Sequence, residues 1–177
     1  MDLIVTPAPE QQAHRGTLVL FGENYDCALG RTGIRPDKHE GDGATPVGRF
    51  ALREIRYRAD RLTLPDTPIL ATPTGKHDGW CDDPVDPAYN RAVALPYGAS
   101  AERMWRDDGL YDLLVILGQN DAPPVAGLGS AIFLHSANVG NDGELGPTEG
   151  CIALPRDTLL ALVPRLTPDM MIDIRTD

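Results

Sequence analysis

One glycine-rich stretch of the sequence combines a histidine with a cysteine. HSANVGNDGELGPTEGCIAL, residues 135–154, begins at His135 and carries Cys151 close to its end. A thiol becomes a useful nucleophile when a neighbour generates or stabilises its thiolate, and imidazole is the side chain best suited to that task near neutral pH. The glycines between them make a return of the chain sterically easy. The stretch therefore suggests a cysteine nucleophile with a histidine base.

Gly150 stands directly before the cysteine and permits a sharp turn there. Such a turn would aim the backbone N–H groups of Gly150 and Cys151 at a developing oxyanion, and a helix beginning near Pro155 would lower the pKa of the thiol. Taken singly, however, a cysteine is most often a small buried hydrophobe and a histidine a satisfied polar group. The spacing alone leaves both interpretations open.

The elements that must position these residues are predicted to be mainly strands. Eighteen glycines and sixteen prolines divide the chain into short segments, which favours strands and loops over long helices. The apolar runs at 111–120 and 130–136 have strand length and end in polar residues, as buried strands that open onto a site do. Further strands are predicted at 47–58, at 170–174, and at 16–22 and 25–33, which would form a hairpin around Glu23 and Asn24.

Two short helices are predicted. Residues 100–108 begin with an N-cap serine and place Met104 and Trp105 on one side. Residues 155–166 have Pro155 at an early helical position and apolar residues on one face, with an interruption at Pro164. We therefore expect a mainly β, single domain over residues 1–177 with one or two short helices, and a flexible segment at residues 1–15.

Candidate substrate contacts lie largely in a long irregular segment, residues 59–96, because such a loop in a compact domain is usually functional. Its patch GWCDDPVDPAYN (79–90) holds Trp80, Tyr89 and Asn90, whose types are suited to contact a substrate, although Trp80 could equally anchor the loop to the core. Three more candidates lie elsewhere. Asn120 either orients the site or caps a strand, and Thr148 bonds either within the turn or to His135; the third is Glu149.

Composition limits the possible functions. The 177 residues, 42% of them hydrophobic, suffice for one domain with a substantial core. The net charge of −10 argues against a nucleic-acid surface. No apolar run reaches the length of a membrane span, and the opening MDLIVTPAPE does not look like a secretory signal, as expected for a mature, shortened or cytoplasmic chain. Three cysteines without CxxC or HxxxH spacing predict neither a disulfide framework nor a metal site, and we expect no cofactor.

Several motifs together resemble one known family. FLHSANVGNDGELGPTEGCIAL resembles the signature of the YkuD-type L,D-transpeptidase catalytic domain, and GATPVGRF (43–50) and LTPDMMIDI (166–174) are similar to its Thr-Pro-x-Gly-x-Phe hairpin and its closing strand. GWCDDPVDPAYN, YDLLVILGQN and GLGSAIFLH resemble a proteobacterial branch. The resemblance covers roughly residues 16–175. It implies a β-sandwich or barrel-like domain in which Cys151 is catalytic.

Two positions depart from the family pattern. Glu149 replaces a histidine two residues before the cysteine, and Ala153 replaces an arginine two residues after it, as in the branch named above. An arginine that would bind a carboxylate of the donor peptide is thus missing. A carboxylate at Glu149 would, if anything, oppose formation of the thiolate.

The resemblance implies acyl transfer on peptidoglycan stem peptides, which would be both donor and acceptor. Cys151 would attack the donor at diaminopimelate and release D-alanine, with His135 as base and Gly150 in the oxyanion site. The acceptor would be an amine, giving a 3,3 or 1,3 cross-link, or water, giving an L,D-carboxypeptidase. Carbapenems would be possible inhibitors. We expect a monomer in the periplasm or cell wall. The rival hypothesis is a non-catalytic β module that binds wall peptides or glycans.

Overall fold

The computed structural model describes residues 2–9 and 12–177, which form a mainly β structure. Its elements in chain order are β1 (Leu3–Pro7), β2 (Arg15–Leu20), β3 (Glu23–Ala28), β4 (Ile34–Arg35), β5 (Thr45–Pro46), β6 (Gly48–Tyr57), β7 (Ala71–Pro73), β8 (Asp78–Cys81), β9 (Ala92–Ala94), β10 (Ala101–Arg103), β11 (Leu113–Leu117), β12 (Phe133–Ser136), β13 (Ile152–Leu154), α1 (Arg156–Leu162), the 3₁₀ helix η1 (Val163–Arg165) and β14 (Met171–Ile174). Within the described residues, no helix is long and apolar enough to cross a membrane.

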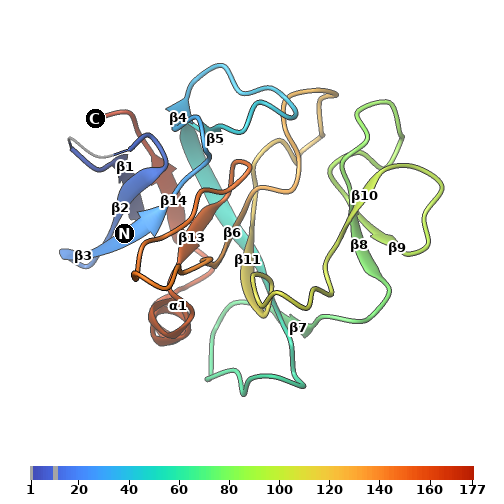
Figure 1. The fold of residues 1–177 in the computed structure, drawn as a ribbon. Helices are drawn as coiled ribbons and strands as arrows, with labels where there is room; N and C mark the ends of the chain where they lie inside the picture. The colour runs from blue at the N-terminus through green and yellow to red at the C-terminus, as the bar shows by residue number, and fades with distance from the viewer. Residues whose placement is uncertain (1, 10–11) are drawn as a thin grey trace.

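The large sheet closes on itself like a barrel. Its strand order is β11-β12-β13-β3-β2-β1-β14-β6-β7, and β11 also pairs with β6 (Figure 1). The long strand β6 makes this closure possible, because its first part pairs with β14 and its second part with β11. Closure satisfies the backbone groups that an open edge would leave exposed. The predicted barrel-like β fold is therefore confirmed.

The barrel interior is filled by alternate residues of its strands. In β2 buried and partly buried residues alternate strictly. Leu18 and Leu20 are fully buried, whereas Val19 between them is only partly buried. This follows from the two-residue period of a strand. At α1, Leu159 and Leu162 add their side chains to the same core. The helix packs against β11 and β12 and thereby holds in place the strands on which the site is built.

Strands β11, β12 and β13 are buried on both faces. Leu113 and Val115 of β11 belong to the barrel core, whereas Leu114 belongs to a second apolar cluster with Phe133 and Cys151. A small sheet of order β10-β8-β9 (Figure 1) lies beside this second face. Its Trp80 packs edge-on against Phe133 with ring centroids 5.4 Å apart. Burial on both faces explains why the sequence shows unbroken apolar runs here.

Most predicted strands are confirmed. The strands expected at 47–58, 111–120, 130–136 and 170–174 correspond to β6, β11, β12 and β14. The hairpin is also correct, but its turn lies earlier than expected, because Leu20 pairs with Glu23 and the turn consists of Phe21 and Gly22. Their φ angles of 53° and 81° are those of the tight turns that match the twist of a hairpin. The segment expected to be flexible contains β1, which pairs with β2 and β14.

The helix predicted at 100–108 is wrong. Ala101–Arg103 instead forms β10, which pairs antiparallel with β8 and sets Glu102 opposite Trp80. Local helix signals are weak and yield to tertiary pairing. The irregular segment 59–96 likewise contains β7, β8 and β9. The helix at 155–166 is confirmed in part: α1 ends at Leu162, and Pro164, which lacks a backbone N–H, lies in the 3₁₀ turn that follows.

The barrel core yields a first prediction. Replacing Leu18, which is fully buried, by alanine should lower the free energy of unfolding by about 2–5 kcal/mol, because apolar burial is lost and a cavity remains. Urea denaturation measures this change. Leu70→Ala is the matched control, since Leu70 is 67% exposed and its removal should change stability by less than about 0.5 kcal/mol. Equal effects of the two substitutions would contradict the assignment of the core.

Candidate active site

Adjacent parallel strands bring His135 and Cys151 to one cavity. In the register of β12 and β13, His135 lies opposite Ala153, and Cys151 immediately precedes β13. Residues two apart in a strand point to the same face of the sheet. The side chain of Cys151 therefore lies on the same face as those of Ala153 and its neighbour His135. Both side chains line a cavity of about 410 Å³. Cys151 keeps 7% exposure and His135 keeps 5%, so both predicted residues are nearly buried and border the same open space.

The turn before Cys151 requires glycine. Gly150 has φ +144°, and a Cβ there would lie 2.8 Å from the carbonyl oxygen of Ala44. The Thr148 hydroxyl donates a hydrogen bond to the Cys151 carbonyl at 2.7 Å and accepts one from the Gly150 N–H at 3.1 Å. Thr45 also donates to the Cys151 carbonyl, at 3.4 Å. Thr148 thus acts within the turn, the first of its two predicted bonding modes.

The sulfur lies between a hydrogen-bond acceptor and a donor. The thiol donates to the carbonyl oxygen of Ala131 at 3.2 Å, and Sγ accepts the backbone N–H of Phe133 at 3.3 Å. The first bond stabilises the thiol and the second stabilises the thiolate. Ala131 adopts φ +52°, an uncommon conformation for a residue with a Cβ. The residue that accepts the thiol's hydrogen bond therefore has an unusual backbone conformation.

The backbone orients the imidazole. Nδ1 of His135 lies 2.8 Å from the carbonyl oxygen of Ser136, so a neutral ring carries its proton on Nδ1. That tautomer leaves Nε2 as the basic nitrogen. The Tyr111 ring packs edge-on against the imidazole with centroids 5.2 Å apart. A backbone carbonyl therefore occupies the orienting position that a carboxylate or amide side chain fills in other triads.

Burial favours the neutral form of both side chains. It raises the pKa of Cys151 to about 12 and lowers the pKa of His135 to about 4. Desolvation is the largest cause in both cases, because the charged form of each group loses its hydration. Smaller charge effects come from Glu102, which raises the pKa of Cys151, and from Arg106, which lowers it. The resting pair is a thiol and an imidazole rather than an ion pair.

Glu102 is the carboxyl group whose charge acts most on the thiol. It lines the cavity, accepts a hydrogen bond from the Tyr111 hydroxyl at 2.6 Å and lies 3.6 Å from Arg106. Burial raises its own pKa. Glu149 also lines the cavity, but its side chain is 83% exposed and pairs with Arg31. The carboxylate that disfavours the Cys151 thiolate is thus Glu102 and not, as was expected, Glu149. Sequence analysis did not select Glu102.

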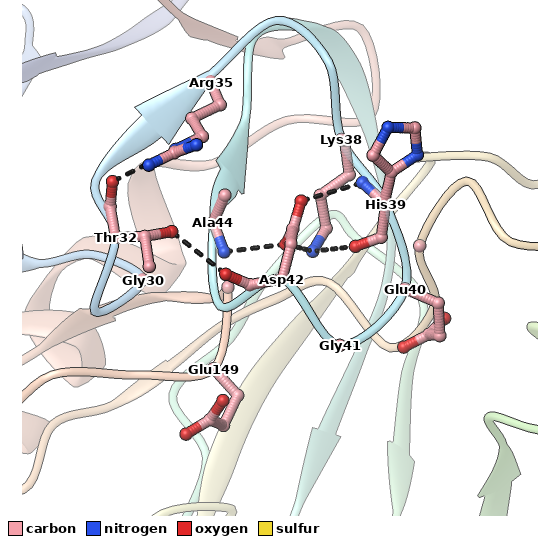
Figure 2. Close-up of polar contacts among 12 residues, drawn as sticks. Gly30, Thr32, Arg35, Lys38, His39, Glu40, Gly41, Asp42, Ala44 and Glu149 are labelled. Atoms are coloured by element: carbon pink, nitrogen blue, oxygen red, sulfur yellow. Dashed lines mark hydrogen bonds and ion pairs between the residues drawn. The ribbon is translucent and has the colours of Figure 1, made fainter.

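The loop between β4 and β5, drawn in Figure 2, contributes Glu40 and Gly41 to the lining of the cavity. The Asp42 carboxylate accepts hydrogen bonds from the Lys38 ammonium and from the backbone N–H groups of His39, at 2.7 Å, and Ala44, at 2.8 Å. These bonds fix the loop and hold Glu40 and Gly41 against the cavity, which both residues line. Figure 2 shows Glu149 below this loop, separated from the Asp42 hydrogen bonds.

Asn90 supports the cavity from behind. Its Oδ1 accepts the indole N–H of Trp80 at 2.9 Å and the backbone N–H of Ala131 at 3.0 Å, and its Nδ2 donates to the carbonyls of Gln119 and Asn120 at 3.0 and 2.8 Å. Its amide is therefore fully used by protein partners. The Ala131 carbonyl accepts the hydrogen bond of the Cys151 thiol. Through its bond to the Ala131 N–H, Asn90 therefore holds in place the residue that contacts the sulfur.

The predicted substrate contacts divide into two groups. Thr148 and Glu149 are among the residues that line the cavity, whereas four candidates are not: Trp80, Tyr89, Asn90 and Asn120. The Tyr89 hydroxyl bonds to Glu40, and the Asn120 side chain bonds to the backbone of Val125 and Gly129. These four therefore lie in the supporting structure around the cavity.

Sequence analysis missed several residues of the cavity. Glu102 and Arg106 fell in the segment predicted to be helical, and Tyr111 was read only as the beginning of a buried strand. Their shared position depends on the long-range pairing of β10 with β8, which leaves no local signal. Within the part of the chain that the structure describes, no three His, Cys, Asp or Glu side chains form a possible metal site. The cavity is therefore lined by the thiol of Cys151, the imidazole of His135 and further polar side chains.

The turn before the nucleophile gives a second prediction. Gly150→Ala should slow alkylation of Cys151 by iodoacetamide at least tenfold, because the new Cβ would meet the Ala44 carbonyl and disturb the sulfur's position. Alkylation is read at each cysteine by peptide mass spectrometry. Gly98→Ala serves as control, since nothing lies within 4 Å of a Cβ at Gly98. Unchanged reactivity in the Gly150 variant would show that the turn does not position the thiol.

Electrostatics at the thiol gives a third prediction. Glu102→Gln removes a negative charge that raises the pKa of Cys151; the pKa should therefore fall, and alkylation at a fixed pH should become several-fold faster. The pH dependence of the Cys151 alkylation rate measures the shift. Glu149→Gln should leave the profile unchanged, because that carboxylate is exposed and paired with Arg31. A larger shift in the Glu149 variant would reverse the assignment.

Comparison with known proteins agrees with this geometry. The family model of the L,D-transpeptidase catalytic domain (YkuD) matches residues 4–174, nearly the whole chain. No curated protein and no solved structure matches it. The matched range contains the barrel, the turn at Gly150 and both residues of the thiol–imidazole pair. The chain belongs to the YkuD family of L,D-transpeptidase catalytic domains.

Proposed function

We propose that this protein is a peptidoglycan L,D-transpeptidase that works through a thioester on Cys151. The observation that carries the proposal is the shared cavity of Cys151 and His135, in a chain whose family acts on cell-wall peptidoglycan. The hydrogen bond of Nδ1 to the Ser136 carbonyl supports it further, because it leaves Nε2 free to accept a proton.

In the first step Sγ attacks the carbonyl carbon of the L-centre of diaminopimelate, the third residue of the donor stem. Nε2 of His135 takes the thiol proton as the C–S bond forms. Collapse of the tetrahedral intermediate breaks the amide bond, and the imidazolium returns the proton to the amine of the departing D-alanine. The neutral resting pair implies that proton transfer accompanies attack, since a preformed thiolate is disfavoured by burial.

The Cys151 N–H is the best donor for the developing oxyanion. Among residues 2–9 and 12–177, it donates no backbone hydrogen bond. The Gly150 N–H already donates to Thr148, so its predicted part in the oxyanion site requires that bond to be exchanged. The Phe133 N–H, 3.3 Å from Sγ, stabilises charge that develops on sulfur. The site thus offers one donor for each developing charge.

In the second step an amine of another stem attacks the thioester carbonyl and expels the thiol. The side-chain amine of diaminopimelate would give a 3,3 cross-link and the amine of the first-position L-alanine a 1,3 cross-link, whereas water would give a carboxypeptidase. Because peptidoglycan lies outside the cytoplasmic membrane, we propose that the protein acts in the periplasm or cell wall. We assign substrate contact to Glu149 and Thr148 and a supporting role to Trp80, Tyr89, Asn90 and Asn120.

The decisive experiment removes the nucleophile. Cys151→Ala, incubated with disaccharide-tetrapeptides, should lose D-alanine release and dimer formation by at least about a thousandfold, as measured by mass spectrometry of the products. Cys27→Ala is the control, because Cys27 is buried in the barrel core and should leave turnover intact.

The same products identify the acceptor by their cross-link or by a free tripeptide. Turnover that persists in the Cys151 variant would exclude the proposed mechanism. Saturable binding without any turnover in the unmodified protein would support the non-catalytic β module instead.

A further inference from the structure

A second open cavity adjoins the active site. It has a volume of about 770 Å³ and is lined by Lys76, Arg103, Trp105, Arg106, Asp107 and Asp108. Arg106 also lines the cavity of Cys151, so the two cavities meet at this side chain. We call the surface of Lys76, Arg103, Trp105 and Arg106 the basic pocket. Its residues come from β10, from the segment directly after it and from the loop before β8.

The basic pocket differs in charge from its surroundings. The protein has a net charge of −10, and the cavity of Cys151 is lined by four carboxylates, Glu40, Asp82, Glu102 and Glu149, against the single cation Arg106. Of the two acidic residues in the second cavity, Asp108 pairs with Arg106 and Asp107 lies 3.7 Å from Arg61. Within the described chain, Lys76 and Arg103 form no ion pair, so both cations are available to an anion.

A buried arginine supports the floor of the basic pocket. Arg58, only 3% exposed, places its guanidinium 3.5 Å from the centroid of the Trp105 ring. It is fixed by two bonds of 2.8 Å to Asp60 and donates to the Arg106 carbonyl at 2.7 Å. The Trp105 ring and the backbone of Arg106 are therefore fixed in position. This reduces the conformational entropy that would be lost when a ligand binds there.

The strand that follows the thiol offers no charge to a substrate. All three residues of β13 are apolar and completely buried. Carboxylates are recognised best by guanidinium groups, which bind both oxygens, and by ammonium groups. In the described structure, the basic pocket is where such groups gather beside the catalytic cavity.

We propose that the basic pocket binds the free carboxylates of the stem peptide while the reacting carbonyl lies over Cys151. This inference rests on the proposed function and names the part of the substrate that each cavity holds. Lys76 and Arg103 hold the carboxylates, and Trp105 covers the apolar stem between the charged groups. The cavity of Cys151 holds the diaminopimelate residue, with the carboxylates of the cavity facing the side-chain amine of that residue.

The test measures binding apart from turnover. In a Cys151→Ala background, Lys76→Ala and Arg103→Ala together should weaken binding of a disaccharide-tetrapeptide roughly tenfold, as expected for two exposed charge contacts, by isothermal titration calorimetry. A peptide with amidated carboxylates should bind the parent and the double variant equally. Arg91→Ala is the matched control, an exposed arginine outside both cavities. Thermal melting checks that each variant remains folded.

Equal affinity of parent and double variant for the free acid would overturn the pocket assignment, while D-alanine release by the unmodified protein would still uphold the proposed function. If the unmodified protein neither binds nor cleaves the muropeptide, the proposed function fails and the pocket assignment with it. Inorganic phosphate is the third probe. Displacement of the peptide by phosphate, combined with undiminished binding of the amidated peptide, would show a general anion site and overturn the assignment to stem carboxylates.

Discussion

The parallel pairing of β12 with β13 is the constraint on which the site depends. It sets His135 opposite Ala153 and so gives the imidazole and the thiol before β13 one common face. Parallel neighbours need a long connection, and residues 137–151 supply it as a glycine-containing excursion rather than a helix. Barrel closure through β6 and β11 then fixes the neighbouring strand β11, and Tyr111, two residues before that strand, packs against the imidazole. The geometry of the pair is thus a property of the sheet, which places the two groups before any substrate arrives.

Desolvation decides the resting state of this pair. Burial moves the pKa of Cys151 to about 12 and that of His135 to about 4, so each shift favours the neutral form. Among the local groups, Glu102 opposes the thiolate, while the Phe133 N–H, Lys38 and Arg106 favour it. In the proposed mechanism, a substrate that fills the cavity adds its own dipoles, and the proton would leave sulfur as the new bond forms. At rest the thiol donates a hydrogen bond to the carbonyl of Ala131.

The sequence predicted those parts of the fold and the site that have a local signal. Apolar runs predicted β11 and β12, and the glycines around the His135–Cys151 excursion predicted its turn. The helix at 100–108 was wrong because Ser100 and Met104 imitate a helix start, whereas pairing with β8 makes the segment a strand. For the same reason Glu102 and Arg106 escaped notice. Asn90 was noticed for its type, but its role depends on four backbone and side-chain partners from distant segments, which spacing along the chain cannot show.

The two sheets contribute different parts of the candidate site. The barrel carries Cys151 and His135, while β8 and β10 of the small sheet, with the segments around them, contribute Glu102, Arg106 and the basic pocket. The two parts are joined by the contact of Trp80 with Phe133 and by the bonds of Asn90 to Ala131. Such an arrangement lets substrate-facing loops vary while the rigid sheet retains the chemistry. In the proposed function, recognition of the donor thus lies on an element apart from the strands that hold the thiol and the imidazole in register.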